Sequence, residues 1–494
     1  MTEMRNKAMR FVEQMKKTQN RTLTENGAFA YISSGSALLD LFFECGALRM
    51  RDPQEIQMMF LRAYAENPEL AMKLAFYTRD IRGGLGERDT ARLFFRALAQ
   101  RHTESLVKNI PLFSEYGRWD DLLVLLDTPA ESAAAALIEK QLREDVSNQL
   151  KGKPISLLAK WLPGINASSK QTREYAKRLC SAMNVSARTY RKVLSQLRSY
   201  LNVTEKNMSQ SMFECIRYQE VPSYAMLRYK NAFSRHDGER FGKYIDEVNQ
   251  KKAVIHSGTM FPYDIARRYL DYRSIDEQEN AVLTAQWNAL PELADSDSSV
   301  LVMADVSGSM DGLPLASSVG LAMYFAERCK GPFHNRFLTF SARPSLCEVK
   351  GTTLKEKFDS IRDADWNINT NFSAAMELVL RTAIEGNLSQ EELPSVIVVI
   401  TDMEFDAADR REMSVTDVMK EKFEAAGYRM PLLVYWNVRA AHNTFHARKD
   451  DSNVILISGH SSNIFRYVFS CISKTPYAFM EEVLNTPRYM PIQI

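Results

Sequence analysis

Three oxygen-bearing side chains alternate in Asp305-Val306-Ser307-Gly308-Ser309, directly after the apolar run Val300–Ala304. Alternate positions of a tight loop can turn toward one centre, and Gly308 permits the bend. Thr370 stands before a predicted helix, and Asp402 follows a second, very apolar run. Carboxylate, hydroxyl and water oxygens can form the octahedral shell that Mg²⁺ prefers, with one position left open.

We therefore predict one site for a divalent cation, Mg²⁺ or a similar ion such as Mn²⁺. Its predicted ligands are Asp305, Ser307, Ser309, Thr370 and Asp402. Taken singly, an aspartate, serine or threonine at such a junction is more often a plain helix cap. The combination favours the metal site, because three separate segments deliver these groups to one expected edge of a sheet.

The same residues argue against catalysis. A phosphoryl-accepting aspartate would need a second acid two residues on, but position 307 is serine, and Gly308-Ser309-Met310 lacks the lysine of a phosphate loop. We expect no enzymatic activity. A metal-dependent hydrolase is the least favoured of three alternatives, because no nucleophile or general base stands beside the predicted ligands.

A second cluster is basic. Residues 151–252 contain 20 Lys and Arg against 8 Asp and Glu, a local charge of +12 in a chain whose net charge is +2. Tyr175, Tyr190 and Tyr200 are interleaved and could stack on bases. Such a face predicts salt-dependent RNA binding, whereas the plainer alternative is a solvated helix surface. The residues expected to contact RNA are Lys170, Arg173, Lys177, Arg188, Arg191, Lys192 and Arg198.

A glycine-rich turn spans residues 79–88, Arg79-Asp80-Ile81-Arg82-Gly83-Gly84-Leu85-Gly86-Glu87-Arg88. Its mixed charges and flexible glycines suit a phosphate-binding turn. They also suit a structural corner between two helices with an internal ion pair, and the sequence leaves both interpretations open.

The elements that must position these groups change character near residue 290. Before it, apolar residues recur at spacings of three and four, which predicts amphipathic helices arranged in HEAT-like repeats. After it, short apolar runs at 300–304, 336–340, 396–400, 431–438 and 454–457 alternate with helical stretches at 313–328, 372–382 and 415–425. This alternation is typical of a doubly wound parallel sheet. We predict an α plus α/β protein with an all-α domain at residues 1–290 and a sheet domain at 295–494.

The length of 494 residues requires at least two domains. No apolar stretch is long enough for a membrane span, so we expect no membrane association. The N-terminus lacks an apolar signal core, and the six cysteines form no C-x-x-C pair. That pattern favours a reducing compartment, so we expect a cytoplasmic protein, with a monomer favoured.

The predicted metal ligands resemble the metal-ion-dependent adhesion site of von Willebrand A domains. Asp305, Ser307 and Ser309 match its D-x-S-x-S, Thr370 its second-loop threonine and Asp402 its T-D aspartate. In that family the open metal position usually accepts a carboxylate from a partner. The resemblance therefore implies an acidic protein partner.

The order of the two halves resembles the Ro autoantigen family, in which a TROVE domain precedes a von Willebrand A domain. A closer resemblance is to a bacterial, phage and plant relative long catalogued as a domain of unknown function. The residues that carry it are 77–88, 160–163, 190–198, 221–223 and 401–406, with further matches toward the C-terminus.

The Ro resemblance implies a ring of helices that holds RNA on a basic surface. No local motif here aligns with the RNA-contacting residues of Ro, so none is carried over. The leading hypothesis is a non-enzymatic, Ro-like ribonucleoprotein component that binds RNA. The alternative is a metal-dependent protein–protein adaptor that binds no RNA.

Overall fold

A computed structural model of the chain describes residue 15 and residues 20–201, 203–256, 260–271, 275–292, 299–339, 343–362, 370–407, 413–468 and 474–494. The chain forms two compact units. The sheet unit comprises Met1–Asp52, Phe261–Ile275 and Leu290–Leu484, and the helical unit comprises Pro53–Met260, Asp276–Ala289 and Asn485–Ile494. Among the described residues, no helix is long and apolar enough to cross a membrane.

The core of the sheet unit is a sheet in which the described residues form six strands, in the order β5-β4-β3-β6-β7-β8. All neighbouring strands are parallel except β4 and β5, which pair antiparallel at one edge. Every residue of β3, β6, β7 and β8 is buried, as expected for strands with helices on both faces. The strands are β3 (Val300–Ala304), β4 (Arg336–Thr339), β5 (Ser345–Glu348), β6 (Val396–Thr401), β7 (Leu432–Asn437) and β8 (Val454–Ser458).

Two adjacent residues of β7 show that helices cover both faces of this sheet. Successive strand residues point to opposite faces. The ring of Trp436 contacts Phe325 of α16, whereas the ring of Tyr435 contacts Phe372 of α18. The predicted doubly wound sheet is therefore present, with the antiparallel β5 as its one departure within the described residues. The helices are α14 (Pro262–Leu270), α16 (Leu313–Arg328), α17 (Leu354–Arg362), α18 (Phe372–Glu385), α19 (Val415–Ala425) and α20 (Pro476–Leu484).

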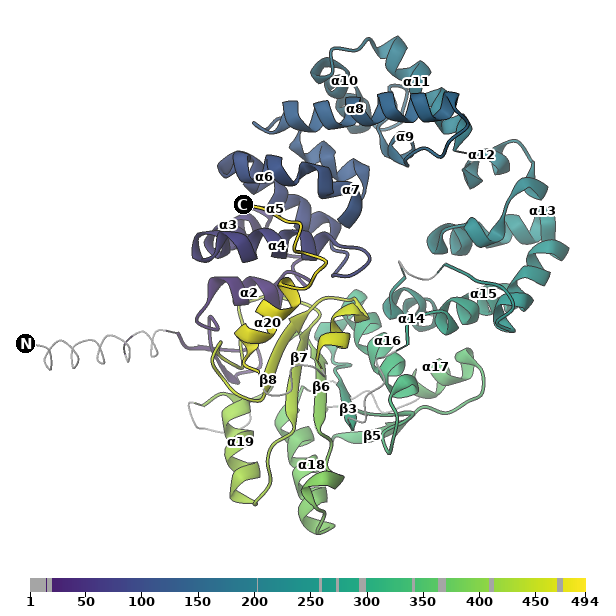
Figure 1. Cartoon of the computed structure of the whole chain (residues 1–494). Coiled ribbons are helices and arrows are strands. Elements are labelled where there is room, and N and C mark those ends of the chain that lie inside the picture. The colour runs from purple at the N-terminus through teal and green to yellow at the C-terminus, as the bar shows by residue number, and fades with distance from the viewer. Residues whose placement is uncertain are drawn as a thin grey trace, which may run out of the picture. The chain divides into compact units, whose positions relative to one another are not determined.

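The N-terminal part of the chain belongs to the sheet unit. The strands β1 (Thr22–Leu23) and β2 (Phe29–Ala30) form a small antiparallel pair. Helix α2 (Ala37–Glu44) packs on β8 and on α20, and Figure 1 shows these purple and yellow segments side by side. Ser458 fixes this contact, because its hydroxyl donates to the carbonyl of Phe42 at 3.1 Å.

The helical unit is an array of helices, as the sequence periodicity predicts, and neighbours such as α3 and α4, α4 and α5, α10 and α11, and α13 and α15 pack on one another (Figure 1). Its helices are α3 (Pro53–Glu66), α4 (Pro68–Arg79), α5 (Arg88–Arg101), α6 (Thr103–Asn109), α7 (Phe113–Tyr116), α8 (Glu131–Leu150), α9 (Leu158–Trp161), α10 (Lys170–Ala182), α11 (Ala187–Tyr200), α12 (Thr204–Ser209), α13 (Ser223–Asn249) and α15 (Glu277–Asn288). Residues 485–494 pack on α4, α6 and α7. There Tyr489 stacks on Tyr116 and meets Tyr77 edge to face, both at 5.8 Å between ring centroids.

The compact units group the chain differently from the expected contiguous domains 1–290 and 295–494. Residues 20–52 and α14 lie in the sheet unit, and residues 485–494 lie in the helical unit. For α14, its packing on α16 explains why it belongs to the sheet unit. Helix α14 crosses α16 so closely at Gly320 that a Cβ there would lie 3.0 Å from the backbone of Pro262.

Candidate functional site

The predicted metal ligands lie where the connections of the sheet change direction. From β3 the chain passes to β4 on one side, whereas β6 pairs with β3 on the other. Asp305 follows β3 and Asp402 follows β6, and the N–H of Asp305 donates to the carbonyl of Ile400 at 2.9 Å. Open α/β sheets bind ligands in the crevice at this switch point.

Hydrogen bonds join four of the five predicted ligands. The Asp305 carboxylate accepts from the Ser307 N–H at Oδ1 over 2.9 Å and from the Thr401 hydroxyl at Oδ2 over 2.7 Å. The hydroxyl oxygens of Ser307 and Ser309 are 3.1 Å apart, and the Ser309 side chain hydrogen-bonds to Asp402. Asp305, Ser307, Ser309 and Asp402 therefore form one cluster of oxygen atoms.

The fifth predicted ligand, Thr370, is buried but less directly connected. Its carbonyl accepts a hydrogen bond from the N–H of Asp406 at 3.0 Å, which holds its loop against the segment after β6. Among the described residues, no hydrogen bond joins the Thr370 side chain to the other four ligands. The preceding Asn369 lies outside the described residues.

Burial sets the electrostatics of this cluster. Desolvation, followed by the charge of neighbouring Asp402, raises the pKa of Asp305 to about 7. Desolvation likewise raises the pKa of Asp402, against the lowering effect of the Ser309 hydrogen bond. Two buried carboxylates that repel each other have a local excess of negative charge. A divalent cation would relieve it, and the oxygen-only donor set fits a hard ion such as Mg²⁺ or Mn²⁺.

No three His, Cys, Asp or Glu side chains gather as a metal-binding group within the described parts of the chain. A cation at the sheet edge would therefore depend on hydroxyl oxygens as well as on the two carboxylates. That combination is the one predicted from the alternating Asp305, Ser307 and Ser309.

Sequence reasoning missed two charged neighbours of this cluster. Arg439 follows β7, donates to the carbonyl of Ser309, and has its Nη1 4.0 Å from Oδ2 of Asp402. Glu404 is buried and accepts from the N–H of Glu25 at 2.6 Å and from the Thr444 hydroxyl at 3.1 Å. Glu404 alternates with Asp402 and was detectable in the segment 401–406. Nothing in the local sequence marks Arg439.

In the helical unit, the predicted RNA-contacting residues divide into two groups. Lys177, Arg188, Arg191 and Lys192 are exposed on α10 and α11. Lys170 is also exposed, with its Nζ 3.9 Å from Glu174.

Arg173 and Arg198 instead support the backbone. Arg173 donates to the carbonyls of Ala167 and Ser168, each at 2.7 Å. Arg198 is half-buried and donates to the carbonyls of Ala159 at 2.8 Å and Leu162 at 2.7 Å. Both side chains were predicted to contact RNA, and the structure shows that much of their donor capacity is already used.

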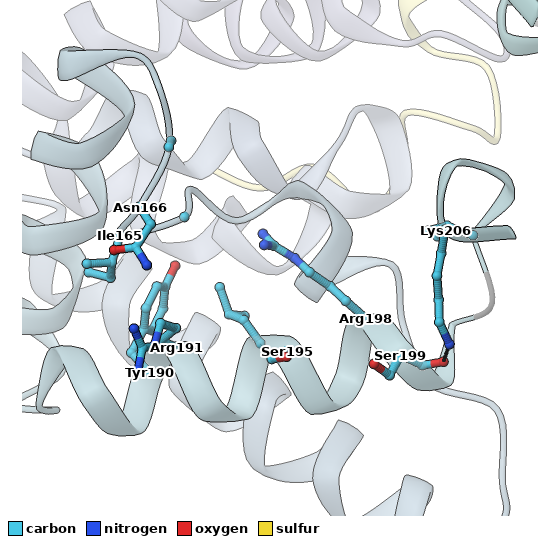
Figure 2. A pocket seen from close by; sticks show the side chains of 12 residues that line it. Ile165, Asn166, Tyr190, Arg191, Ser195, Arg198, Ser199 and Lys206 are labelled. Atoms are coloured by element: carbon cyan, nitrogen blue, oxygen red, sulfur yellow. Dashed lines mark hydrogen bonds between the residues drawn. The ribbon is translucent and has the colours of Figure 1, made fainter. Parts of the chain in front are cut away.

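Beside α11 lies a pocket of about 530 Å³, which we call the α11 pocket. Figure 2 shows Tyr190 and Arg198 extending from α11 toward the loop that carries Ile165 and Asn166. The lining residues include three cationic and no acidic side chains. They are Gly164, Ile165, Asn166, Ala167, Tyr190, Arg191, Leu194, Ser195, Arg198, Ser199, Val203 and Lys206.

The interleaved tyrosines do not form a common stacking platform. Tyr190 is buried and donates from its hydroxyl to the carbonyl of Pro163 at 2.9 Å, and burial raises its pKa. Tyr175 is half-buried. Tyr200 is 38% exposed, and its hydroxyl donates to the carbonyl of Lys153 at 3.0 Å. Of the three residues, Tyr200 alone is exposed.

The glycine-rich turn at residues 79–88 is a structural corner. Arg79 and Arg92 each form a 2.7 Å ion pair with the buried Asp121. A Cβ at Gly84 would lie 2.1 Å from the carbonyl oxygen of Tyr77, so the close backbone approach explains that glycine. The structural corner, one of the two interpretations left open by the sequence, fits this geometry, but its buried ion pairs join Arg79 to Asp121 and Asp80 to Arg488 and do not form within the turn.

Two sequence families match this chain, and both are described as domains of unknown function. DUF2828 matches residues 24–136 and 132–297, and DUF7788 matches residues 299–478. The uncharacterized protein L728 of Acanthamoeba polyphaga mimivirus is 30% identical over an alignment of 515 residues, gaps included. The alignment covers 96% of this chain and 89% of the viral protein. The chain belongs to the DUF2828 family.

Membership in DUF2828 confirms the expected relative catalogued as a domain of unknown function. The DUF2828 match ends at residue 297 and the DUF7788 match begins at residue 299. The two matches therefore meet just before β3 of this chain. Among solved structures, the chain is similar to the Deinococcus radiodurans Ro (RSR) protein, at 13% identity and a TM-score of 0.47. That likeness covers 92% of this chain and 99% of the Ro chain.

Proposed function

We propose that this protein binds RNA without enzymatic activity and that the α11 pocket and the exposed cations around it form the RNA contact. The observation that carries this proposal is the charge of the pocket lining, with Arg191, Arg198 and Lys206 and no acidic residue among the twelve. A concave site of one sign concentrates a polyanion and speeds its association. The pocket volume of about 530 Å³ is in the range of small-ligand sites and suits one nucleotide of a strand.

The exposed cations next to the pocket extend this positive surface. Arg188, Arg191 and Lys192 form no ion pair within the described parts of the chain, whereas Arg178 is paired with Asp127 and Glu131. Cations that keep their charge toward solvent release counterions from a phosphate backbone, and each contact steepens the fall of affinity with salt. Arg178 therefore contributes less than its exposure suggests.

The test is the salt dependence of binding to a short single-stranded RNA, compared between wild type and the triple variant Arg188→Glu, Arg191→Glu, Lys192→Glu. Arg198 is left intact because it holds the loop around Leu162. We expect weaker binding and a flatter salt slope in the triple variant. The matched control is Lys350→Glu, Lys420→Glu, Arg429→Glu, which makes the same charge change at exposed positions of the sheet unit.

Equal losses in the two triple variants would show that net charge alone governs binding. Absence of RNA binding by the wild type at low salt would remove the RNA proposal and leave the adaptor as the better account.

The second candidate function is a metal-dependent adaptor, and it rests on the paired buried carboxylates of Asp305 and Asp402. A bound Mg²⁺ or Mn²⁺ would neutralise them and offer one open position to the carboxylate of an acidic protein partner. Asp305→Ala should abolish Mn²⁺ binding, measured by titration calorimetry, while RNA binding persists if the two sites act separately. Magnesium-dependent turnover of a phosphoester, lost in the same variant, would support the hydrolase alternative instead.

A further inference from the structure

Arg439 lies at the same edge of the sheet as the proposed metal ligands. It follows β7, the neighbour of β6, and its N–H donates to Oδ1 of Asn437 at 3.0 Å, which fixes the turn. Its guanidinium donates to the carbonyl of Ser309 and stays 37% exposed, 4.0 Å from Asp402. The guanidinium is therefore anchored in the site while the side chain stays partly exposed to solvent.

A fixed cation next to a proposed metal ligand needs an explanation, because a guanidinium and a divalent cation repel each other. With Asp305 and Asp402 both ionised, a divalent ion balances their two charges, and Arg439 leaves an excess of positive charge. Glu404 does not face this excess directly, since its oxygens accept from the Glu25 N–H and the Thr444 hydroxyl. An anion placed between the metal and Arg439 would satisfy both cations.

We propose that Arg439 is a specificity-determining residue that shares one carboxylate ligand with the metal ion. One oxygen of the carboxylate takes the open metal position, and the other accepts from the guanidinium fork. The inference rests on the metal site proposed above. It goes further by assigning half of the ligand recognition to a residue outside the adhesion-site pattern.

The depth of the site favours a carboxylate over a phosphodiester. Asp305, Ser307 and Asp402 are all at most 5% exposed, whereas Gly308 and Ser309 stand at the opening. A recessed site can be reached by a group at the end of an Asp or Glu side chain. A backbone phosphodiester would have to bring a sugar on each side of the phosphate into the same recess.

The experiment measures Mn²⁺ affinity by titration calorimetry with and without acetate, for the full chain and three variants. Arg439→Gln removes the charge, and Arg439→Lys keeps the charge but not the fork. Arg336→Gln makes the matched charge change at the first residue of β4. Arg336 therefore lies where the parallel strands begin, whereas the proposed metal ligands lie where they end. Anion and metal binding are thermodynamically linked, so acetate held by both should tighten Mn²⁺ binding.

We expect acetate to tighten Mn²⁺ binding in wild type and in Arg336→Gln, less in Arg439→Lys, and not in Arg439→Gln. Without acetate, Arg439→Gln should bind Mn²⁺ about three- to tenfold more tightly, because a repulsive charge is gone. An equal effect of acetate in wild type and Arg439→Gln would overturn the proposal. A stronger effect of dimethyl phosphate than of acetate in wild type would overturn the choice of a carboxylate. Failure of the wild type to bind Mn²⁺ would instead refute the metal site itself.

Discussion

The hydroxyl of Thr401 donates to Oδ2 of Asp305 over 2.7 Å and so ties the last residue of β6 to the residue after β3. Both groups are fully buried. The bond leaves Oδ2 oriented by one strand while the Ser307 N–H holds Oδ1 within its own loop. The position of the Asp305 carboxylate is therefore fixed before any cation arrives.

Thr401→Val should weaken Mn²⁺ binding about tenfold or more, because residues that orient a metal ligand typically contribute that much to affinity. Valine keeps the shape of threonine and removes only the hydroxyl. The matched control is Thr339→Val, at the buried end of β4, where the hydroxyl is 3.5 Å from the carbonyl of Ser345. An unchanged Mn²⁺ affinity in Thr401→Val would mean that the hydroxyl does not position Asp305.

Arg198→Lys should loosen the loop around residues 159–164 although it keeps the positive charge. Lysine cannot reproduce the fork that donates to the carbonyls of Ala159 and Leu162. The loss of two hydrogen bonds from a charged donor corresponds to about 2–4 kcal/mol of local stability. Hydrogen exchange of the amides in this loop measures it, and Arg188→Lys on the exposed side of the same helix serves as the control. Unchanged exchange in Arg198→Lys would show that the loop does not need the fork.

His446 should contribute to the sheet unit a stability that is lost in mild acid. This side chain is fully buried, its Nε2–H donates to the carbonyl of Met403 at 2.9 Å, and burial lowers its pKa from 6.5 to about 4. As the pH falls below 6.5 the unfolded chain takes up a proton that the folded unit refuses until about pH 4. The contribution of His446 to stability is therefore complete above pH 6.5 and falls by on the order of 3 kcal/mol toward pH 4, whereas the raised pKa of Asp305 contributes with the opposite sign.

Urea unfolding of wild type and of His446→Gln at several pH values isolates this contribution, because the buried carboxylates titrate in both proteins. Relative to wild type, His446→Gln should gain stability as the pH falls from 6.5 to 4, even if the variant is less stable at neutral pH. The buried His460, whose pKa is also lowered, keeps its own contribution in both proteins. A slope equal to that of wild type would assign the acid sensitivity to other groups.

Arg488→Met should destabilise the helical unit by about 3–5 kcal/mol, because it leaves the buried Asp80 without its charge partner. Arg488 donates to Oδ1 of Asp80 at 2.7 Å, and the Tyr489 hydroxyl is 3.0 Å from Oδ2. Adding Asp80→Asn removes the unpaired charge and should recover part of the loss. Thermal unfolding of both single variants and the double variant gives the coupling energy. Additive losses would show that the two residues do not act as a pair.

Local sequence was enough to predict most of the sheet unit between residues 300 and 458. The expected runs coincide with β3, α16, β6, α19, β7 and β8 to within one or two residues, because buried parallel strands are continuous β-branched runs. The strand β5 was missed because three of its four residues are exposed and carry no such pattern.

Features that depend on distant residues were not predictable in this way. Nothing near Arg198 distinguishes an arginine that faces carbonyls from one that faces solvent. Likewise α14 has an amphipathic pattern that suits either unit, and its contact with Gly320 of α16 decides its place. In the candidate metal site the ligands were predicted from alternation, whereas Arg439 comes from a third strand and reaches the cluster only in the folded chain.

The segments exchanged between the units also set the order in which the chain can finish folding during synthesis. Residues 485–494 belong to the helical unit but leave the ribosome after the whole sheet unit has been made. Until then Tyr77 and Tyr116 lack the ring of Tyr489 that packs against them. The apolar surface around these two rings therefore stays exposed while about two hundred further residues are translated. A chaperone would bind this surface during that interval.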